Sequence, residues 1–348
     1  MPQPAIHSES GAAAANANTN AQPGAGVPWV AASDVMRRLL HQAQVVATRP
    51  GAVLITGESG TGKSRLGEEI HAASPRRSGP FLRQGCGEFD LGTLEATLFG
   101  HTRDAYTSSQ TDQQGLLGKA DGGTLVLDDV DCLPLRAQAG LLRFMDDGGY
   151  YRLGEPGRLL KSDVRLILTT NHDLEALTIS GQFRRDLWFR MRRWRLHVPP
   201  LRARREDIRE LALHFLKEAQ EAQGSYSFPC PTFDDEVLEF LQMQAWPGNI
   251  RDLHDAVKNI EAFGVARNGF YSLATVAHIL FDHERNSGVE LWESRATVSG
   301  PNNGTLDDAQ VRRVLQMTGW NISLASRILG RSRTTLYKFI KDRGWRQP

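Results

Sequence analysis

The residues with the clearest chemistry form one short stretch that fits the pattern G-x-x-x-x-G-K-[ST] at every fixed position: Gly57, Glu58, Ser59, Gly60, Thr61, Gly62, Lys63 and Ser64. Its glycines let the backbone curl so that several N–H groups point at one phosphate chain. Lys63 would reach the β- and γ-phosphates, and Ser64 would ligate Mg²⁺. The stretch therefore predicts a site for ATP and Mg²⁺, with a glycine-rich surface turn as the alternative.

The elements around this stretch are those that a phosphate loop needs. Ala52–Thr56 is apolar and β-prone, and residues 65–71 carry apolar side chains at helical spacing. Between residues 51 and 200 the pattern alternates strands and helices, which predicts an α/β fold with a mostly parallel sheet covered on both faces. The expected strands are Ala52–Thr56, Phe81–Gln84, Thr124–Asp128, Val164–Thr170 and Trp194–Val198.

Hydrolysis of ATP also needs a carboxylate for the metal and a base for the attacking water. The apolar strand that ends at Asp128 and Asp129 supplies both: Asp128 would hold Mg²⁺ and Asp129 would polarise the water. Asn171 follows another expected strand and would orient water near the γ-phosphate. The alternative for the two acids is that they cap the next helix.

A cation for the developing charge is expected from the arginine-rich segment 184–205. Arg184 and Arg190 are candidates for arginine fingers, which reach the nucleotide of a neighbouring subunit when the subunits form a ring. A solvated basic face is the alternative for this segment.

The chain divides by composition into several parts. Residues 1–27 are polar and small and are expected to be disordered. Asp34–Ala47 is an expected helix with Ser33 as its N-cap. The α/β subdomain is expected over 28–204, a helical lid over 205–283 and a linker over 284–304. The lid helices are expected at Glu206–Gln220, Phe233–Met243, Ile250–Ala262 and Leu273–Leu280.

The last segment, 305–348, begins at a capping-box-like Thr305-Leu306-Asp307-Asp308 and reads as a helix-turn-helix with helices over 309–317, 322–329 and 332–341. It holds nine Lys or Arg against three Asp, and this excess of six positive charges favours DNA as a partner. A solvated basic hairpin is the alternative. The residues expected to face base edges are Arg331, Ser332, Arg333, Thr334, Thr335, Tyr337 and Lys338.

Composition excludes several other classes. The 348 residues are 40% apolar and 23% charged, as in an ordinary soluble protein, and the net charge is +1. The three scattered cysteines form no disulfide or zinc pattern and suit a reducing cytoplasm. The histidines have no metal-binding spacing. No apolar run approaches the ~18 residues of a membrane span, and no signal peptide is recognisable.

At this point the chain resembles the bacterial enhancer-binding proteins, the AAA+ family that activates sigma-54 RNA polymerase. The resemblance covers residues 29 to 348 and includes a Fis-type helix-turn-helix. It implies a ring, commonly a hexamer, that remodels the polymerase with ATP. It also implies finger roles for Arg184 and Arg190 and a nucleotide contact for Arg251. The motifs that carry it, besides the phosphate loop, are residues 98–101, 120–125, 169–171, 199–208 and 246–253.

The chain departs from the family pattern at four places. The polymerase-contact loop, normally G-A-F-T-G-A, reads Asp104, Ala105, Tyr106, Thr107, Ser108 and Ser109 here. The family's usual Asp-Glu pair is Asp128-Asp129, and its switch asparagine is replaced by Gly85. His172 stands where an arginine is usual. No sensory domain is expected before the ATPase core, so control by a partner protein or by expression level is expected.

Two functions follow from these residues. The first is a DNA-binding transcriptional regulator that hydrolyses ATP to remodel sigma-54 polymerase at a promoter or enhancer. The second is a nucleotide-binding, weakly hydrolysing regulator that acts as repressor, co-regulator or hetero-oligomer subunit. A metabolic P-loop kinase or transport ATPase is disfavoured because the basic tail and helical lid have no place in it.

Overall fold

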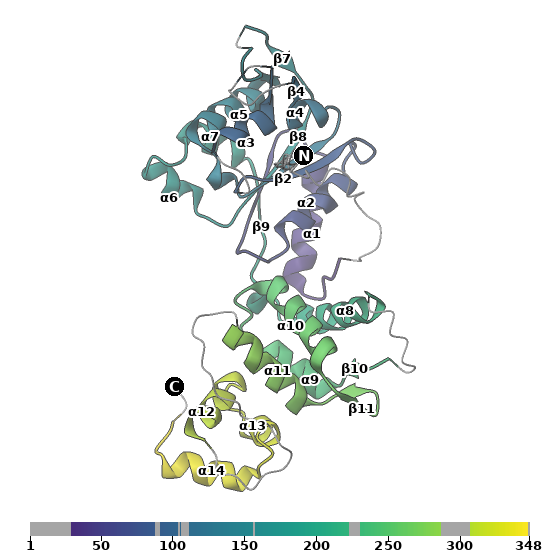
Figure 1. Ribbon diagram of the computed structural model, residues 1–348, viewed down its shortest axis with the longest axis vertical. Helices are drawn as coiled ribbons and strands as arrows, with labels where there is room; N and C mark the ends of the chain where they lie inside the picture. The colour runs from purple at the N-terminus through teal and green to yellow at the C-terminus, as the bar shows by residue number, and fades with distance from the viewer. Residues whose placement is uncertain are drawn as a thin grey trace, which may run out of the picture. The chain divides into compact units, whose positions relative to one another are not determined.

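The computed structural model describes residues 29–87, 91–103, 105, 111–155, 157–222, 230–286 and 307–346 (Figure 1). Contacts within the chain group it into two compact units. The first contains residues 43–56 and 64–196, and the second contains 28–42, 57–63 and 197–348.

The first unit is built on a five-stranded sheet in the order β2-β5-β8-β1-β9. The pairs β2–β5, β5–β8 and β1–β8 are all parallel, which confirms the predicted α/β class. In the register, Val53 lies opposite Ile167 and Gly85 lies opposite Asp128. The strands are β1 (Val53–Thr56), β2 (Phe81–Gly85), β5 (Thr124–Asp128), β8 (Arg165–Thr170) and β9 (Trp194–His197).

The central strands are buried on both faces, as parallel sheets require. Leucines of β5 and β8 join the aromatic and aliphatic side chains of α5 (Leu135–Asp147) and α7 (Arg185–Met191) in one hydrophobic core. The alternating Val126 and Ile167 face α2 (Lys63–Ala72), where a Cβ on Gly67 would lie 3.5 Å from each of them. Accordingly, α5 and α7 lie on one side of the sheet and α2 on the other (Figure 1).

The remaining elements of residues 29–204 are helix α1 and several shorter helices and strands. Helix α1 (Asp34–Ala47) has the predicted bounds, and Ser33 Oγ accepts from the Met36 N–H at 3.4 Å, as expected of an N-cap. The others are α3 (Leu91–Phe99), β3 (Gly100–His101), β4 (Gln113–Gln114), α4 (Leu116–Lys119), η1 (Val130–Cys132), β6 (Gly149–Tyr150), β7 (Leu160–Lys161), α6 (Leu174–Ile179) and η2 (Leu201–Ala203).

The second unit contains a helical lid with its own core, including Trp246 and Tyr271. Phe233, expected in a helix, lies instead in strand β10, because the Asp234 side chain caps the next helix through the Val237 N–H at 2.9 Å. The elements are α8 (Glu206–Ala222), β10 (Thr232–Phe233), α9 (Asp235–Met243), α10 (Asn249–Phe263), β11 (Ala266–Arg267), β12 (Phe270–Tyr271) and α11 (Leu273–Asn286).

The three expected C-terminal helices are present as α12 (Asp308–Met317), α13 (Ile322–Ile328) and α14 (Arg333–Asp342). Their common core contains Val311, Val314, Ala325, Leu336 and Ile340. Each helix has a side-chain N-cap, from Asp307, Asn321 and Ser332 respectively. Thr305 and Leu306 of the expected capping box lie outside the described residues. Gly330, with φ +61°, makes the turn between α13 and α14.

Cys86, Cys132 and Cys230 are free thiols. Within the described ranges, no group of three acidic, histidine or cysteine side chains is placed to hold a metal ion. None of the helices in that part of the chain is both long enough and apolar enough to cross a membrane.

Candidate nucleotide and DNA sites

The glycines of the phosphate loop take backbone conformations that other residues avoid. Gly57, Gly60 and Gly62 have φ values of +152°, +73° and +98°. A Cβ on Gly60 would lie 2.2 Å from the backbone oxygen of Gly248, and one on Gly57 would lie 2.6 Å from that of Val198. The loop therefore needs glycine at both positions for conformation and for space.

Two charged side chains fix the loop's shape. Lys63 is buried, and its Nζ donates to the backbone oxygens of Gly57 at 3.0 Å and Glu58 at 3.1 Å. Arg202 forms a bidentate pair with the Glu58 carboxylate at 2.7 and 2.5 Å. Hydrogen bonds from Arg202 and then Asn249 lower the pKa of Glu58 to about 2.

Asn249, at the start of α10, ties the loop to the lid. It is fully buried in the left-handed conformation (φ +57°). Its Oδ1 accepts from the Leu201 N–H at 2.8 Å, and its Nδ2 donates to Ser59 O at 2.9 Å and Glu58 Oε2 at 3.2 Å. These bonds give a physical role to the Asn of the Trp-Pro-Gly-Asn motif at 246–249.

A buried ion pair of Arg204 with Asp207 contacts the same loop. Arg204 donates from Nη2 to the backbone oxygen of Thr61 at 2.7 Å, and its Nη1 lies 4.0 Å from the Asp207 carboxylate. Asp207 accepts from the Ser33 N–H at 2.7 Å and Oγ at 3.0 Å. Burial lowers the pKa of Arg204 to about 10. Arg204 lies in the motif at 199–208, but the sequence predicted no role for it.

Arg251, expected to touch nucleotide, lies in the first turn of the lid's α10. It is exposed, and its Nη1 donates to Ser59 Oγ at 3.3 Å. The lid therefore brings Arg251 to the phosphate loop, and its contact with nucleotide stays a prediction.

In the first unit, the two predicted metal ligands meet at the carboxyl ends of the strands. Ser64 Oγ donates to the Asp128 carboxylate, 3.0 Å from Oδ1 and 3.1 Å from Oδ2. Thr169 of β8 donates to Asp128 Oδ1 at 2.8 Å. A hydroxyl and a carboxylate are oxygen donors of the kind that Mg²⁺ prefers, so the donor set fits this ion.

Arg83, which the sequence analysis did not single out, joins this cluster from β2. Its Nε lies 2.5 Å from Asp128 Oδ2, and its Nη2 lies 2.8 Å from Ser64 Oγ. A guanidinium thus bridges the two side chains expected to hold the metal. Its side chain is 51% exposed, so solvent reaches this side of the cluster.

Two of the predicted catalytic residues directly follow strands β5 and β8, whose ends form this cluster. The backbone of Asp129 has the left-handed conformation (φ +54°), which Asp tolerates better than most residues. Its N–H donates to Thr169 Oγ1 at 3.4 Å. Asn171 directly follows β8 and is exposed. Gly85, opposite Asp128 in the register, presents no side chain to either acid.

A third acid, Asp131, lies next to these residues. Asp131 accepts from the Thr170 hydroxyl, and its Oδ2 lies 2.8 Å from Nδ1 of His172. His172, one of the departures from the family pattern, lies just after the end of β8. It is therefore held there by the carboxylate of Asp131.

The two finger candidates are on or next to α7 and keep their guanidinium groups exposed. Arg184 is the N-cap residue and pairs with Asp186 at 3.1 and 2.7 Å, which raises the pKa of Arg184. Arg190 lies 3.3 Å from the Asp146 carboxylate through Nε. Both are thus placed on an accessible surface of the first unit.

Of the predicted polymerase-contact loop, Ala105 is described, and Asp104, Tyr106, Thr107, Ser108 and Ser109 lie outside the described residues. Strands β3 and β4, which precede and follow this segment, pair antiparallel.

The predicted DNA-facing residues lie together at the start of α14. Ser332 Oγ caps the helix through the Thr335 N–H at 3.1 Å and contacts Thr335 Oγ1 at 2.8 Å. Arg333, Thr334, Tyr337 and Lys338 are exposed, whereas Leu336 between them is buried. The first two turns of α14 therefore present a polar and basic face.

Three family models match consecutive parts of the chain. Residues 29–197 match the sigma-54 interaction domain, 202–272 match an AAA+ ATPase lid domain, and 307–341 match the bacterial regulatory proteins of the Fis family.

Known proteins resemble the chain over most of its length. The transcriptional regulatory protein GlrR of Escherichia coli is 36% identical over 311 residues, 89% of this chain and 67% of that protein. The regulator NtrC of E. coli is 36% identical over 310 residues, 84% of this chain and 65% of NtrC. The chain thus spans about two thirds of the length of these relatives.

Solved structures agree with these relatives. NtrX from Brucella abortus, in complex with ADP, matches with a TM-score of 0.68 and 28% identity over 91% of this chain and 70% of that one. Its complex with ATP matches with the same TM-score and identity. Together with the three matched domains in order, these similarities show that the chain belongs to the family of sigma-54-dependent transcriptional activators, with an AAA+ core and a Fis-type DNA-binding domain.

Proposed function

We propose that this chain binds ATP with Mg²⁺ at Gly57–Ser64 and hydrolyses it to remodel sigma-54 RNA polymerase at promoters that its C-terminal domain recognises. The observation that carries this proposal is the contact of Ser64 Oγ with both carboxylate oxygens of Asp128, at 3.0 and 3.1 Å. That pair places the acid at the end of β5 against the hydroxyl that ends the phosphate loop. P-loop hydrolases use this arrangement.

Each residue has a distinct part in the proposed reaction. Mg²⁺, when bound, would neutralise charge on the phosphates, and Ser64 and Asp128 would hold it. Lys63 would exchange its contacts with loop carbonyls for the β- and γ-phosphates. Asp129 would accept the proton of the attacking water, and Asn171 would orient that water.

Assembly and the lid would complete the site. Arg251 would contact the nucleotide from the lid, next to Ser59. In a ring, Arg184 or Arg190 of a neighbouring copy would stabilise the charge that develops on the γ-phosphate. The exposed guanidinium groups of both residues support this role, and the ATP complex of the related NtrX supports ATP as the nucleotide.

The proposal is tested by ATP-dependent open-complex formation with sigma-54 polymerase, comparing the natural chain with Lys63→Ala and Asp129→Glu. We expect promoter opening by the natural chain and none by Lys63→Ala, with DNA binding retained by both. Asp129→Glu restores the usual acid and is expected to keep or increase the hydrolysis rate.

One observation favours a second function, a nucleotide-binding regulator that hydrolyses ATP weakly and does not open promoters. Gly85 stands where the family's switch asparagine is usual, and it lies opposite Asp128 in the strand register without a side chain to offer the catalytic acids. Asp129 is also one methylene shorter than the usual Glu, and a misplacement of ~1 Å can lower a rate about 100-fold. Failure of all three versions to open the promoter, with DNA binding intact, would establish this second function.

A further inference from the structure

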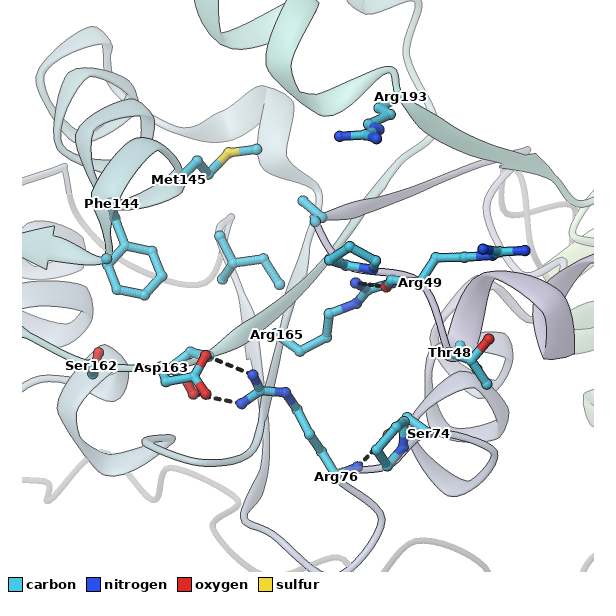
Figure 2. Close-up of a pocket in the computed structure, with 18 of the residues that line it drawn as sticks. Thr48, Arg49, Ser74, Arg76, Phe144, Met145, Ser162, Asp163, Arg165 and Arg193 are labelled. Carbon is cyan, nitrogen blue, oxygen red and sulfur yellow. Dashed lines mark hydrogen bonds and ion pairs between the residues drawn. The ribbon is translucent and has the colours of Figure 1, made fainter.

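A cavity of about 560 Å³ opens at the edge of the sheet where β1 and β8 begin (Figure 2). Parallel strands run from this edge towards Asp128 and Thr170, so the cavity lies at the opposite edge from the predicted metal ligands. The lining residues come from five separate segments of the first unit, within 47–52, 74–76, 144–148, 162–166 and 190–193.

The lining is strongly basic, with a formal charge of +4 from five arginines and one aspartate: Arg49, Arg76, Arg165, Arg190, Arg193 and Asp163. The aspartate is already neutralised, because Arg76 Nη2 lies 2.6 Å from Asp163 Oδ1. Of the remaining arginines, Arg190 pairs at 3.3 Å with Asp146, which is not a lining residue, whereas Arg49, Arg165 and Arg193 have no acid from the lining as a partner.

The deepest of these arginines has no carboxylate partner among the described residues. Arg165 is 8% exposed, and its two terminal nitrogens donate only to backbone oxygens, those of Arg49 and Val46. Its Nε is buried with no hydrogen-bond partner. A buried cation that lacks both a counter-ion and one hydrogen bond is costly, unless an anion reaches it. Burial, and then the charge of Arg76, lower the pKa of Arg165 to about 10.

Two further arginines at the cavity are exposed and available. Arg49 and Arg193 form no ion pair among the described residues, and Arg193 stacks over Trp194 at 5.7 Å. In Figure 2 the guanidinium of Arg193 lies over the cavity, across from Arg165 and Arg76. An anion in the cavity could therefore be contacted from opposite sides.

The remaining wall differs in character. Phe144 and Met145 lie together on one side of the cavity in Figure 2, across from Arg76 and Arg165. The hydroxyl of Ser162 is buried there with no hydrogen-bond partner. The cavity thus offers guanidinium groups on one side, apolar surface on another and an unsatisfied hydroxyl between them.

We propose that this cavity binds a phosphorylated small molecule of nucleotide size. Guanidinium groups bind phosphate oxygens with paired hydrogen bonds, and the volume suits a ligand of this size. The apolar wall would hold the base or another flat part of the ligand. The phosphates could belong to a free molecule or to the nucleotide on a neighbouring copy, since the finger candidate Arg190 lines the same cavity.

The test uses the full chain with Lys63→Ala, which disables the phosphate loop, and calorimetric titration with inorganic pyrophosphate, ribose 5-phosphate and 5′-GMP. We expect one molecule bound per chain and tighter binding of 5′-GMP than of ribose 5-phosphate. Adding Arg49→Ala or Arg193→Ala should weaken binding at least tenfold. Arg158→Ala removes an arginine that pairs with Glu155 outside the cavity and should change nothing. Arg165 is left intact because its backbone contacts support the fold.

Sedimentation separates the two sources of phosphate. Binding by the monomeric Lys63→Ala chain identifies a free ligand. Binding of ATP that requires both Lys63 and an oligomer, and that Arg193→Ala weakens but Arg158→Ala does not, identifies a neighbour's nucleotide. The proposal is overturned if no phosphate probe binds in either setting, or if the Arg49, Arg193 and Arg158 variants bind equally well. Thermal melting confirms that each variant is folded.

Discussion

At the scale of single residues, the least expected feature is the position of Arg83. Side chains alternate along a strand, so Arg83 and Gly85 of β2 point to the same face. Gly85 lies opposite Asp128 but has no side chain, and Arg83 reaches the carboxylate instead, at 2.5 Å. A guanidinium thereby lies between the two proposed metal ligands, where a bound cation would compete with it.

This geometry predicts that Arg83→Gln strengthens the binding of ADP with Mg²⁺ by up to about tenfold, equivalent to 1.4 kcal/mol. The physical reason is that the competing cation, with its charge-assisted hydrogen bonds, no longer has to be displaced. Calorimetric titrations with Mg²⁺ and with EDTA measure the effect, and metal-free ADP should bind no more tightly than before. Arg65→Gln, which removes an arginine next to Ser64 that pairs with Glu68, is the control. If Arg83→Gln weakened ADP binding equally with and without Mg²⁺, Arg83 would instead be a contact for the nucleotide.

A pH dependence follows from Glu58. Its folded pKa is lowered from 4.5 to about 2 by Arg202 and Asn249, so the carboxylate stabilises the fold above pH 4.5 and loses this effect as the pH falls towards 2. Glu58→Gln should therefore be less stable than the natural chain at pH 6, and the difference should shrink between pH 4.5 and pH 2. Denaturant unfolding across this range measures it. A difference that is constant with pH would contradict the role of the charge.

At the scale of elements, the start of α10 connects the lid to the phosphate loop. The left-handed turn at Asn249 directs its amide to Leu201 on one side and to Ser59 on the other. The backbone of the next residue, Ile250, also donates to Gly60 O at 2.9 Å. Lid and loop are therefore joined by side-chain and backbone hydrogen bonds, so that a movement of α10 changes the loop.

This connection predicts that Asn249→Ala destabilises the protein by about 2–3 kcal/mol, because the buried Leu201 N–H loses its acceptor and alanine is strained at φ +57°. Nucleotide affinity should fall as well. Asn268→Ala is a matched control, since Asn268 has φ +51° but is exposed in the β11–β12 turn. Thermal melting and ADP titration measure both variants. If Asn249→Ala and Asn268→Ala lost stability and ADP affinity equally, the backbone strain alone would explain the effect.

At the scale of the whole molecule, the net charge of +1 hides an uneven distribution of acidic and basic residues between the parts of the chain. The two acids that would bind the metal and activate water, Asp128 and Asp129, lie at the end of β5. The C-terminal domain, in contrast, carries a large excess of positive charge, and its exposed side chains at the start of α14 are polar and basic. A nucleic acid is attracted to such a domain by release of its counterions.

The placement of α14 predicts that Arg333→Ala weakens specific DNA binding by about 1–3 kcal/mol and reduces discrimination between sites, because its guanidinium would contact base edges. Lys341→Ala removes the same charge from the last turn of α14 and should weaken specific and non-specific binding alike. Fluorescence anisotropy at several salt concentrations with specific and unrelated DNA separates these effects. Unchanged affinity and discrimination in Arg333→Ala would place the recognition surface elsewhere.

Local sequence determined most of the elements. Helix α1 and strand β5 have the bounds expected from apolar periodicity and capping, because such patterns depend on residues that are near one another in the chain. The error at Phe233 arose because β10 has only two residues and depends on pairing with the distant β12. The phosphate loop was predictable for the same reason as the helices, since all of its chemistry lies within eight consecutive residues.

The sequence by itself therefore determined the phosphate loop, the parallel sheet, the two acids at the end of β5 and the basic helix-turn-helix. Only the tertiary structure revealed that Arg83 lies between Ser64 and Asp128, that Asn249 holds the loop, and that five arginines from four separate segments line one cavity. The reason is physical. Local patterns record hydrophobic period and backbone conformation, whereas these contacts join residues 19 to 190 positions apart, which only the folded chain brings together.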